Sequence, residues 1–145
     1  MFEVIEHTAD VGIRVEADNL KNLFLDAAEG MFAVMLESKP NLIPAITIPI
    51  DVQLTNPDQV KLSFEAQLLV KWLQELLFVF ETRHIVPTHF FIDQISKQGL
   101  EGCYKGLKFD KRYHKLLHEI KAVTYHQLQV NQTERGWEAR VIFDI

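Results

Sequence analysis

The sequence predicts a single α+β domain in which two helices pack on one face of a mainly antiparallel β-sheet. Two long segments carry apolar residues at helical spacing, and several shorter segments alternate apolar and polar residues as half-buried strands do. These segments do not follow a regular β-α-β order, which argues against a parallel sheet. With 145 residues and neither an internal repeat nor a linker-like stretch, residues 1–145 are expected to form one domain.

The first third of the chain is expected to form two short strands and a helix. Residues 2–6 and 13–17 are the expected strands, and in the second of them the apolar residues fall on one face. The segment between them contains Gly12 and is expected to supply the turn. Residues 20–36 then carry leucine, phenylalanine, alanine and methionine at the spacing of an amphipathic helix.

A second strand and helix pattern occupies the middle of the chain. Residues 46–54 alternate between apolar and polar side chains, which predicts a half-buried strand. Pro49 lies inside this run and cannot donate a backbone hydrogen bond, so the strand is expected at the edge of a sheet. Ser63 is a suitable N-cap for a helix over residues 64–82. The polar stripe of that helix is narrow, so most of its surface is expected to be buried.

The rest of the chain is expected to consist of strands, over residues 84–95, 100–109, 120–130 and 137–145. A kink is expected at Pro87 in the first of them. Gly102 and Gly106 in the second predict a bulge or a close approach of another backbone. The polar segment 131–136 predicts a turn that joins the last two strands in a hairpin.

The composition is that of a globular protein, with 48% hydrophobic and 24% charged residues. The net charge of −5 argues against a wide surface that grips phosphate backbones. No apolar stretch is long enough to span a bilayer, and the first residues lack the basic start and cleavage site of a signal peptide. Cys103 is the lone cysteine, so a reducing compartment is expected. These features predict a cytoplasmic protein without membrane contact.

Two aspartates near the two ends of the chain are candidates for a metal site. Strand alternation places Asp144 on the face opposite the expected core residues Ala139, Val141, Phe143 and Ile145. If the two ends pair in one sheet, Asp10 and Asp144 meet, and with the backbone oxygen of Ile145 they supply part of the oxygen shell that Ca²⁺ or Mg²⁺ requires. On spacing alone, the commoner explanation is that Asp10 caps a turn and Asp144 is a solvated acid.

Lys121 begins a strand-like run over residues 121–126. Beside the two aspartates, its ammonium group would orient them or pair with a phosphate. On the sequence alone, the commoner role of such a lysine is that of a solvated edge residue that discourages aggregation.

Three other groups of side chains are weaker candidates. His114 and His118 are four residues apart, but no zinc-binding pattern accompanies them. Residues 108–115 interleave basic and aromatic side chains as a small nucleic-acid patch does, yet Asp110 interrupts them, which favours a solvated loop. Cys103 has no evident histidine and acid partners, which favours a buried, inert thiol. The residues alone therefore predict no self-sufficient catalytic set.

Four motifs lie in the same order as in one known family and extend over essentially the whole chain: residues 7–12 (HTADVG), 68–77 (LLVKWLQELL), 119–126 (EIKAVTYH) and 143–145 (FDI). Through them the sequence resembles the archease family, small cofactors of tRNA-splicing RNA ligases of the RtcB type. The first, third and fourth motifs are specific in combination, whereas each alone is not.

The resemblance implies a protein activator rather than an enzyme. It implies that the chain promotes guanylylation of the ligase, lets it turn over repeatedly and relaxes its nucleotide choice. Carried over by motif, the family's metal site falls on Asp10, Asp144 and the backbone oxygen of Ile145, and its functional lysine falls on Lys121. Leu107 stands where the family usually has an acid, which removes one acidic group from that loop.

The expected cofactor is a divalent cation, either Ca²⁺ or Mg²⁺/Mn²⁺, bound by oxygen ligands. The expected partner is an RtcB-type ligase, with RNA touched only indirectly. One alternative is a chaperone or modulator of RNA-modifying enzymes, such as tRNA methyltransferases, in which the metal is structural. Another is a small metal-dependent hydrolase of nucleotides, against which the lack of a recognisable base or nucleophile beside the acids argues.

Overall fold

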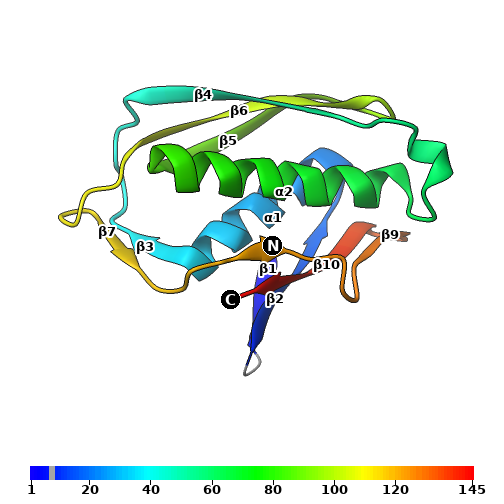
Figure 1. Cartoon of the computed structure of the whole chain (residues 1–145), viewed down its shortest axis with the longest axis horizontal. Coiled ribbons are helices and arrows are strands. Elements are labelled where there is room, and N and C mark those ends of the chain that lie inside the picture. The colour runs from blue at the N-terminus through cyan, green and yellow to red at the C-terminus, as the bar shows by residue number, and fades with distance from the viewer. Residues whose placement is uncertain (7–8) are drawn as a thin grey trace.

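Two helices lie between antiparallel sheets in the computed structural model, which describes residues 1–6 and 9–145 (Figure 1). Helix α1 spans Leu20–Met35 and helix α2 spans Phe64–Arg83. The side chain of Asn19 accepts a hydrogen bond from the backbone N–H of Asn22 and so caps α1, and Ser63 caps α2 in the same way through Ala66. Both helices were predicted to within one residue. Neither of them is long and apolar enough to cross a membrane, and the described residues hold no other candidate span.

The larger sheet joins both ends of the chain. Its central strand, β10, pairs with β2 along one edge and with the short strands β8 and β9 along the other, and β1 completes the sheet beyond β2. All these pairings are antiparallel. The bounds are Phe2–Glu6 for β1, Asp10–Ala17 for β2, Ala122–Val123 for β8, Gln129–Thr133 for β9 and Gly136–Asp144 for β10.

A three-stranded sheet covers the opposite side of the helices (Figure 1), in the order β4 (Ile46–Gln53), β6 (Gly99–Lys108) and β5 (Ile85–Ser96). Strand β4 is an edge strand, as Pro49 predicted, and the register of β5 shifts after Pro87, where the kink was expected. A Cβ on Gly102 or Gly106 would lie 2.3 or 2.1 Å from a carbonyl oxygen of β5, so the predicted close approach is confirmed.

Two short elements link these layers. Strands β3 (Leu36–Ser38) and β7 (His114–Leu116) form a two-stranded ladder after the end of α1, and a single 3₁₀ turn, η1 (Pro57–Gln59), precedes α2. Two buried hydrogen bonds join neighbouring elements of the core, one between the two helices and one within the three-stranded sheet. The indole of Trp72 in α2 donates to the carbonyl of Phe24 in α1 at 3.0 Å, and the hydroxyl of Tyr104 in β6 donates to the carbonyl of Ile85 at 3.0 Å. Burial raises the pKa of that hydroxyl to about 12.

The α+β class is confirmed, but the strands divide among three sheets instead of forming one. The physical reason is the narrow polar stripe of α2. A helix that is apolar on most of its surface buries two sides, and α2 contacts β4 of one sheet and β8 and β9 of the other.

The first predicted turn differs from the structure. Strand β2 begins at Asp10, so Gly12 lies inside a strand, where a Cβ would clash with Ile142 at 2.9 Å. His7 and Thr8, which the prediction placed in this turn, lie outside the described residues.

The last hairpin also differs from the prediction. Strand β9 continues to Thr133, so the turn is Glu134–Arg135 and not 131–136. The polar residues at the end of β9 are exposed and pair through their backbones, so their polarity is compatible with a strand. The expected strand over 120–130 is interrupted between β8 and β9.

Candidate functional site

Asp10 and Asp144 lie directly opposite each other at one end of the larger sheet. The register of β2 and β10 runs from Ala17 opposite Trp137 to Asp10 opposite Asp144. Residues that oppose each other across antiparallel strands project to the same face, with Cβ atoms about 4.5–5.5 Å apart. The structure therefore brings together two carboxylates that are separated by almost the whole sequence.

This pair is electrostatically unfavourable in the absence of a counter-charge. Like charges directly opposite each other destabilise a strand pair. In addition, Oδ1 of Asp10 is buried and accepts no hydrogen bond from the described residues. A buried carboxylate oxygen without a donor costs free energy. Asp144 is exposed, so the pair has one open side. A cation at this position would relieve both costs.

Ile145 and Lys121 are held close to this pair by the fold. The side chain of Ile145 packs against the core, which positions the backbone that follows Asp144. The backbone N–H of Lys121 donates to the carbonyl of Asp144 at 2.7 Å, directly before β8 pairs with the end of β10. The side chain of Lys121 is exposed, and within the described residues it forms no ion pair with either aspartate.

The donor set fits a hard cation better than zinc. Two carboxylates and a backbone carbonyl are oxygen ligands, and Ca²⁺ or Mg²⁺ would take its remaining ligands from water or a partner. Among the residues that the structure describes, no cluster of three or more histidines, cysteines and acids could hold a metal. The two histidines do not form a pair, because His114 is buried and its Nδ1 accepts from the backbone N–H of Asp110 at 3.0 Å, whereas His118 is exposed.

The strand alternation that was used to predict the pair is confirmed on the core side. Ala139, Val141 and Phe143 are buried. On the other face, Ile142 is also buried, because it packs over Gly12. Sequence alternation missed this small apolar contact on the outer face, which lies two cross-strand pairs away from the aspartates.

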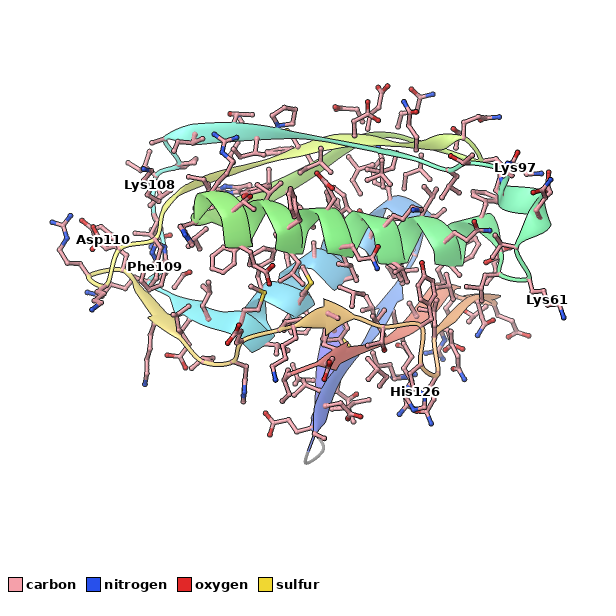
Figure 2. All side chains as sticks on the ribbon, in the orientation of Figure 1. Lys61, Lys97, Lys108, Phe109, Asp110 and His126 are labelled. Carbon is pink, nitrogen blue, oxygen red and sulfur yellow. The ribbon has the colours of Figure 1, made fainter. Side chains whose placement is uncertain are left out.

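The basic segment over residues 108–115 is largely a turn and a short strand at one end of the molecule (Figure 2). Arg112 forms a bidentate interaction with Asp110, with its Nη2 at 2.7 Å from Oδ2, and these hydrogen bonds lower the pKa of Asp110 to about 2. Asp110 thus neutralises part of the segment, in agreement with the prediction of a solvated loop. Cys103 is half-buried in β6.

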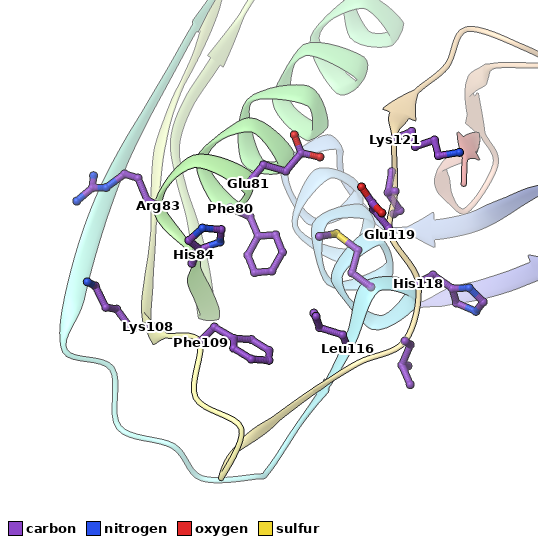
Figure 3. A pocket seen from close by; sticks show the side chains of 13 residues that line it. Phe80, Glu81, Arg83, His84, Lys108, Phe109, Leu116, His118, Glu119 and Lys121 are labelled. Carbon is purple, nitrogen blue, oxygen red and sulfur yellow. The ribbon is translucent and has the colours of Figure 1, made fainter.

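A cleft beside Lys121 was not anticipated from the sequence. It has a volume of about 990 Å³ and separates the C-terminal end of α2 from residues 116–121, which begin at the last residue of β7 and continue beyond the ladder of β3 and β7 (Figure 3). We call it the α2 cleft. Two consecutive leucines on its rim, Leu116 and Leu117, are exposed. Exposed apolar residues of this kind are typical of a binding surface. In the sequence alone, however, two adjacent leucines cannot be told apart from leucines of the core.

Comparisons with known proteins find similarity over the whole chain. Residues 2–145 match the model of the Archease protein family. Protein archease of Methanosarcina acetivorans is 36% identical, with 99% of this chain and 95% of that protein covered. Protein archease of Saccharolobus islandicus is 36% identical, covering 99% and 98%. The solution structure of Methanobacterium thermoautotrophicum protein 1598 is similar with a TM-score of 0.76 and 28% identity, covering 99% of this chain and 98% of that one.

Proposed function

The chain belongs to the archease family, and we propose that it is a non-catalytic activator of an RtcB-type tRNA-splicing RNA ligase. In this role it promotes guanylylation of the ligase and allows repeated turnover. The observation that carries the proposal is the meeting of three family-like motifs at one end of the larger sheet. Asp10 lies opposite Asp144 in the strand register, and the backbone of Lys121 is bonded to Asp144.

We propose that Asp10, Asp144 and the backbone oxygen of Ile145 hold a divalent cation, either Ca²⁺ or Mg²⁺/Mn²⁺. The buried Oδ1 of Asp10, which has no hydrogen-bond partner among residues 1–6 and 9–145, supports this assignment. When bound, such an ion supplies positive charge that polarises phosphate oxygens. Because Asp144 is exposed, water or groups of a partner would have access to such an ion.

The residues of this chain would act on the ligase by electrostatic positioning. The carboxylate pair lies at the end of a sheet, and the exposed side chain of Lys121 belongs to the residue just before β8, which pairs with the end of β10. Such an end can enter the active-site cleft of a partner, where charges held in fixed positions orient the triphosphate for the ligase's own nucleophile. Lys121 would contact phosphate, and the two aspartates would present the cation.

Multiple-turnover RNA ligation by the cognate ligase tests this function. Substoichiometric wild-type protein is expected to raise the number of turnovers, whereas Asp144→Asn is expected to lose at least about tenfold of that stimulation. Asp144 is exposed, so the substitution is expected to leave the fold intact. Glu138→Gln is the matched control, because Glu138 lies on the same strand and the same face.

The outcomes separate the function from the site. Stimulation by wild type and Glu138→Gln, but not by Asp144→Asn, would support both the activator role and the aspartate site. Equal stimulation by all three proteins would refute the site. A wild-type protein without effect on ligation or on ligase guanylylation would refute the function itself.

A further inference from the structure

The α2 cleft has an apolar floor and an exposed apolar rim. The buried residues Met35 and Ile120 line it. Phe80, Phe109 and Leu116 point into the hollow from three different segments (Figure 3). Leu116 is 61% exposed and Leu117 is 41% exposed. Contiguous apolar surface of this kind beside a hollow is typical of a site that another molecule covers.

Charged side chains are separated on the two sides of the cleft. Arg83 and Lys108 lie together on one side, and the carboxylates of Glu81 and Glu119 lie toward the other (Figure 3). None of these four side chains forms an ion pair with another described residue. Their charges are therefore available to a ligand that is acidic at one end and basic at the other.

This arrangement favours a protein segment over a nucleic acid. The exposed apolar residues of the cleft, Leu116 and Leu117, are aliphatic, and the carboxylates of Glu81 and Glu119 accompany its basic side chains. Single-stranded nucleic acids, in contrast, are held mainly by aromatic stacking and a continuous basic groove. Two carboxylates at the mouth would repel phosphates. An aliphatic or aromatic side chain inserted between Phe80, Phe109 and Leu116 would cover the exposed surface in the way that a buried anchor residue does at a protein interface.

The cleft is connected to the aspartate pair through Lys121. Lys121 lines the cleft, and its backbone N–H is bonded to the carbonyl of Asp144. A segment that occupies the cleft would consequently fix the direction in which the pair faces. The cleft would then supply affinity for the partner, and the aspartate pair would supply activation.

We propose that the α2 cleft is the docking groove for a short segment of the RNA ligase. The segment inserts one or two aliphatic or aromatic anchors, places acidic residues against Arg83 and Lys108, and places a basic residue against Glu81 and Glu119. This inference rests on the proposed function, because it takes the ligase as the partner.

Binding and activation measured separately test this proposal. Labelled protein is titrated with the cognate ligase to obtain Kd, and ligation is measured as the concentration of the protein is raised to saturation. The variants Leu116→Glu and Arg83→Glu change the cleft. Val60→Glu and Lys61→Glu are their matched controls, since both residues are exposed and adjacent in the chain, and Lys61 lies at the opposite end of the molecule from Lys108 (Figure 2). Far-ultraviolet circular dichroism checks the fold of every variant.

Leu116→Glu is expected to raise Kd at least about tenfold while its maximal stimulation at saturation equals that of wild type. Arg83→Glu is expected to raise Kd and to weaken its dependence on salt, because it removes an electrostatic contact. Asp144→Asn is expected to show the converse, with little change in Kd and a loss of maximal stimulation. Both control variants should bind as wild type does.

Three results would overturn the docking groove. If wild type stimulates the ligase and both cleft variants bind as tightly as wild type, the groove is refuted and the activator function stands. If wild type neither binds nor stimulates the ligase, both proposals fail. If the free protein binds single-stranded RNA or GTP, and Leu116→Glu abolishes that binding but leaves the affinity for the ligase unchanged, the cleft is a nucleotide site instead.

Discussion

The aspartate pair and the α2 cleft share Lys121 as a neighbour, but they are held in place differently. The pair lies at the end of two long strands whose core-facing side chains, such as Val11 and Phe143, are buried. A shift of one residue in that register would expose the core face, so the position of the aspartates is strongly fixed. The wall of the cleft over residues 117–121 is a connection held by backbone bonds to Met35 and Asp144.

This difference indicates that the aspartate pair is held rigidly, as a metal site requires, whereas the cleft can adapt to a bound partner. A site that presents a cation needs fixed ligand positions, which a packed sheet supplies. A docking groove needs exposed apolar surface, which an irregular connection tolerates because its backbone is partly solvated.

The largest effect on the free energy of unfolding is expected from removing the side chain that packs beneath the aspartate pair. Phe143→Ala is expected to lower the free energy of unfolding by about 3–5 kcal/mol, because its fully buried ring leaves a cavity under the end of β10. Leu116→Ala, at the rim of the cleft, is expected to change it by less than about 0.5 kcal/mol. Urea denaturation of both variants measures the contrast, and equal losses would contradict it.

A smaller effect is expected from calcium. At about a hundred times its Kd, Ca²⁺ is expected to raise the free energy of unfolding by about 2.7 kcal/mol in wild type and in Glu138→Gln. Asp144→Asn should show little rise. Thermal melts with calcium and with EDTA measure this, and an equal rise in Asp144→Asn would place the ion elsewhere. A rise already complete at trace calcium would mark a structural ion, as in the chaperone or modulator alternative.

Neutralising Asp10, the half-buried member of the pair, is expected to raise the free energy of unfolding without metal and to lower it with metal. In EDTA, Asp10→Asn is expected to stabilise the protein by about 0.2–1 kcal/mol, because it removes the repulsion between opposed carboxylates. With Ca²⁺ it is expected to be less stable than wild type, since a ligand is lost. Denaturation in each condition provides the comparison. Destabilisation in EDTA would show that the pair is not under repulsion.

The smallest effect on the free energy of unfolding is expected from the protonation of His114. Burial is the main cause that lowers the pKa of this imidazole below 6.5, against a smaller opposing effect of Asp110. Protonation is thus disfavoured in the folded state, so stability is complete above about pH 6.5 and falls as the pH drops toward the lowered pKa. Denaturation between neutral and mildly acidic pH should show that the free energy of unfolding declines less steeply with falling pH in His114→Gln than in wild type. The exposed His118→Gln should decline as wild type does, and identical slopes for all three would contradict the assignment.

Several features of the fold were predictable because they depend on local chemistry. Ser63 begins α2 because its side chain accepts from a free backbone N–H of the first turn, and Pro49 marks an edge strand because it has no N–H to donate. The outward direction of Asp144 followed from strand alternation alone. The prediction that Asp10 and Asp144 meet depended on the two ends of the chain pairing in one sheet. That pairing is a long-range contact, which local sequence patterns do not determine.

What the sequence determined by itself is therefore the α+β class, the extents of the helices and the core-facing side of regularly alternating strands such as β4 and β10, since these follow from periodicity and capping. Tertiary structure alone decided that α2 is covered by two sheets, that Gly12 lies within a strand beneath Ile142, and that a cleft opens between α2 and Leu116. These features depend on which surfaces meet. A leucine that packs in a core and a leucine that lines an open groove have the same local pattern, and only the packing of distant segments distinguishes them.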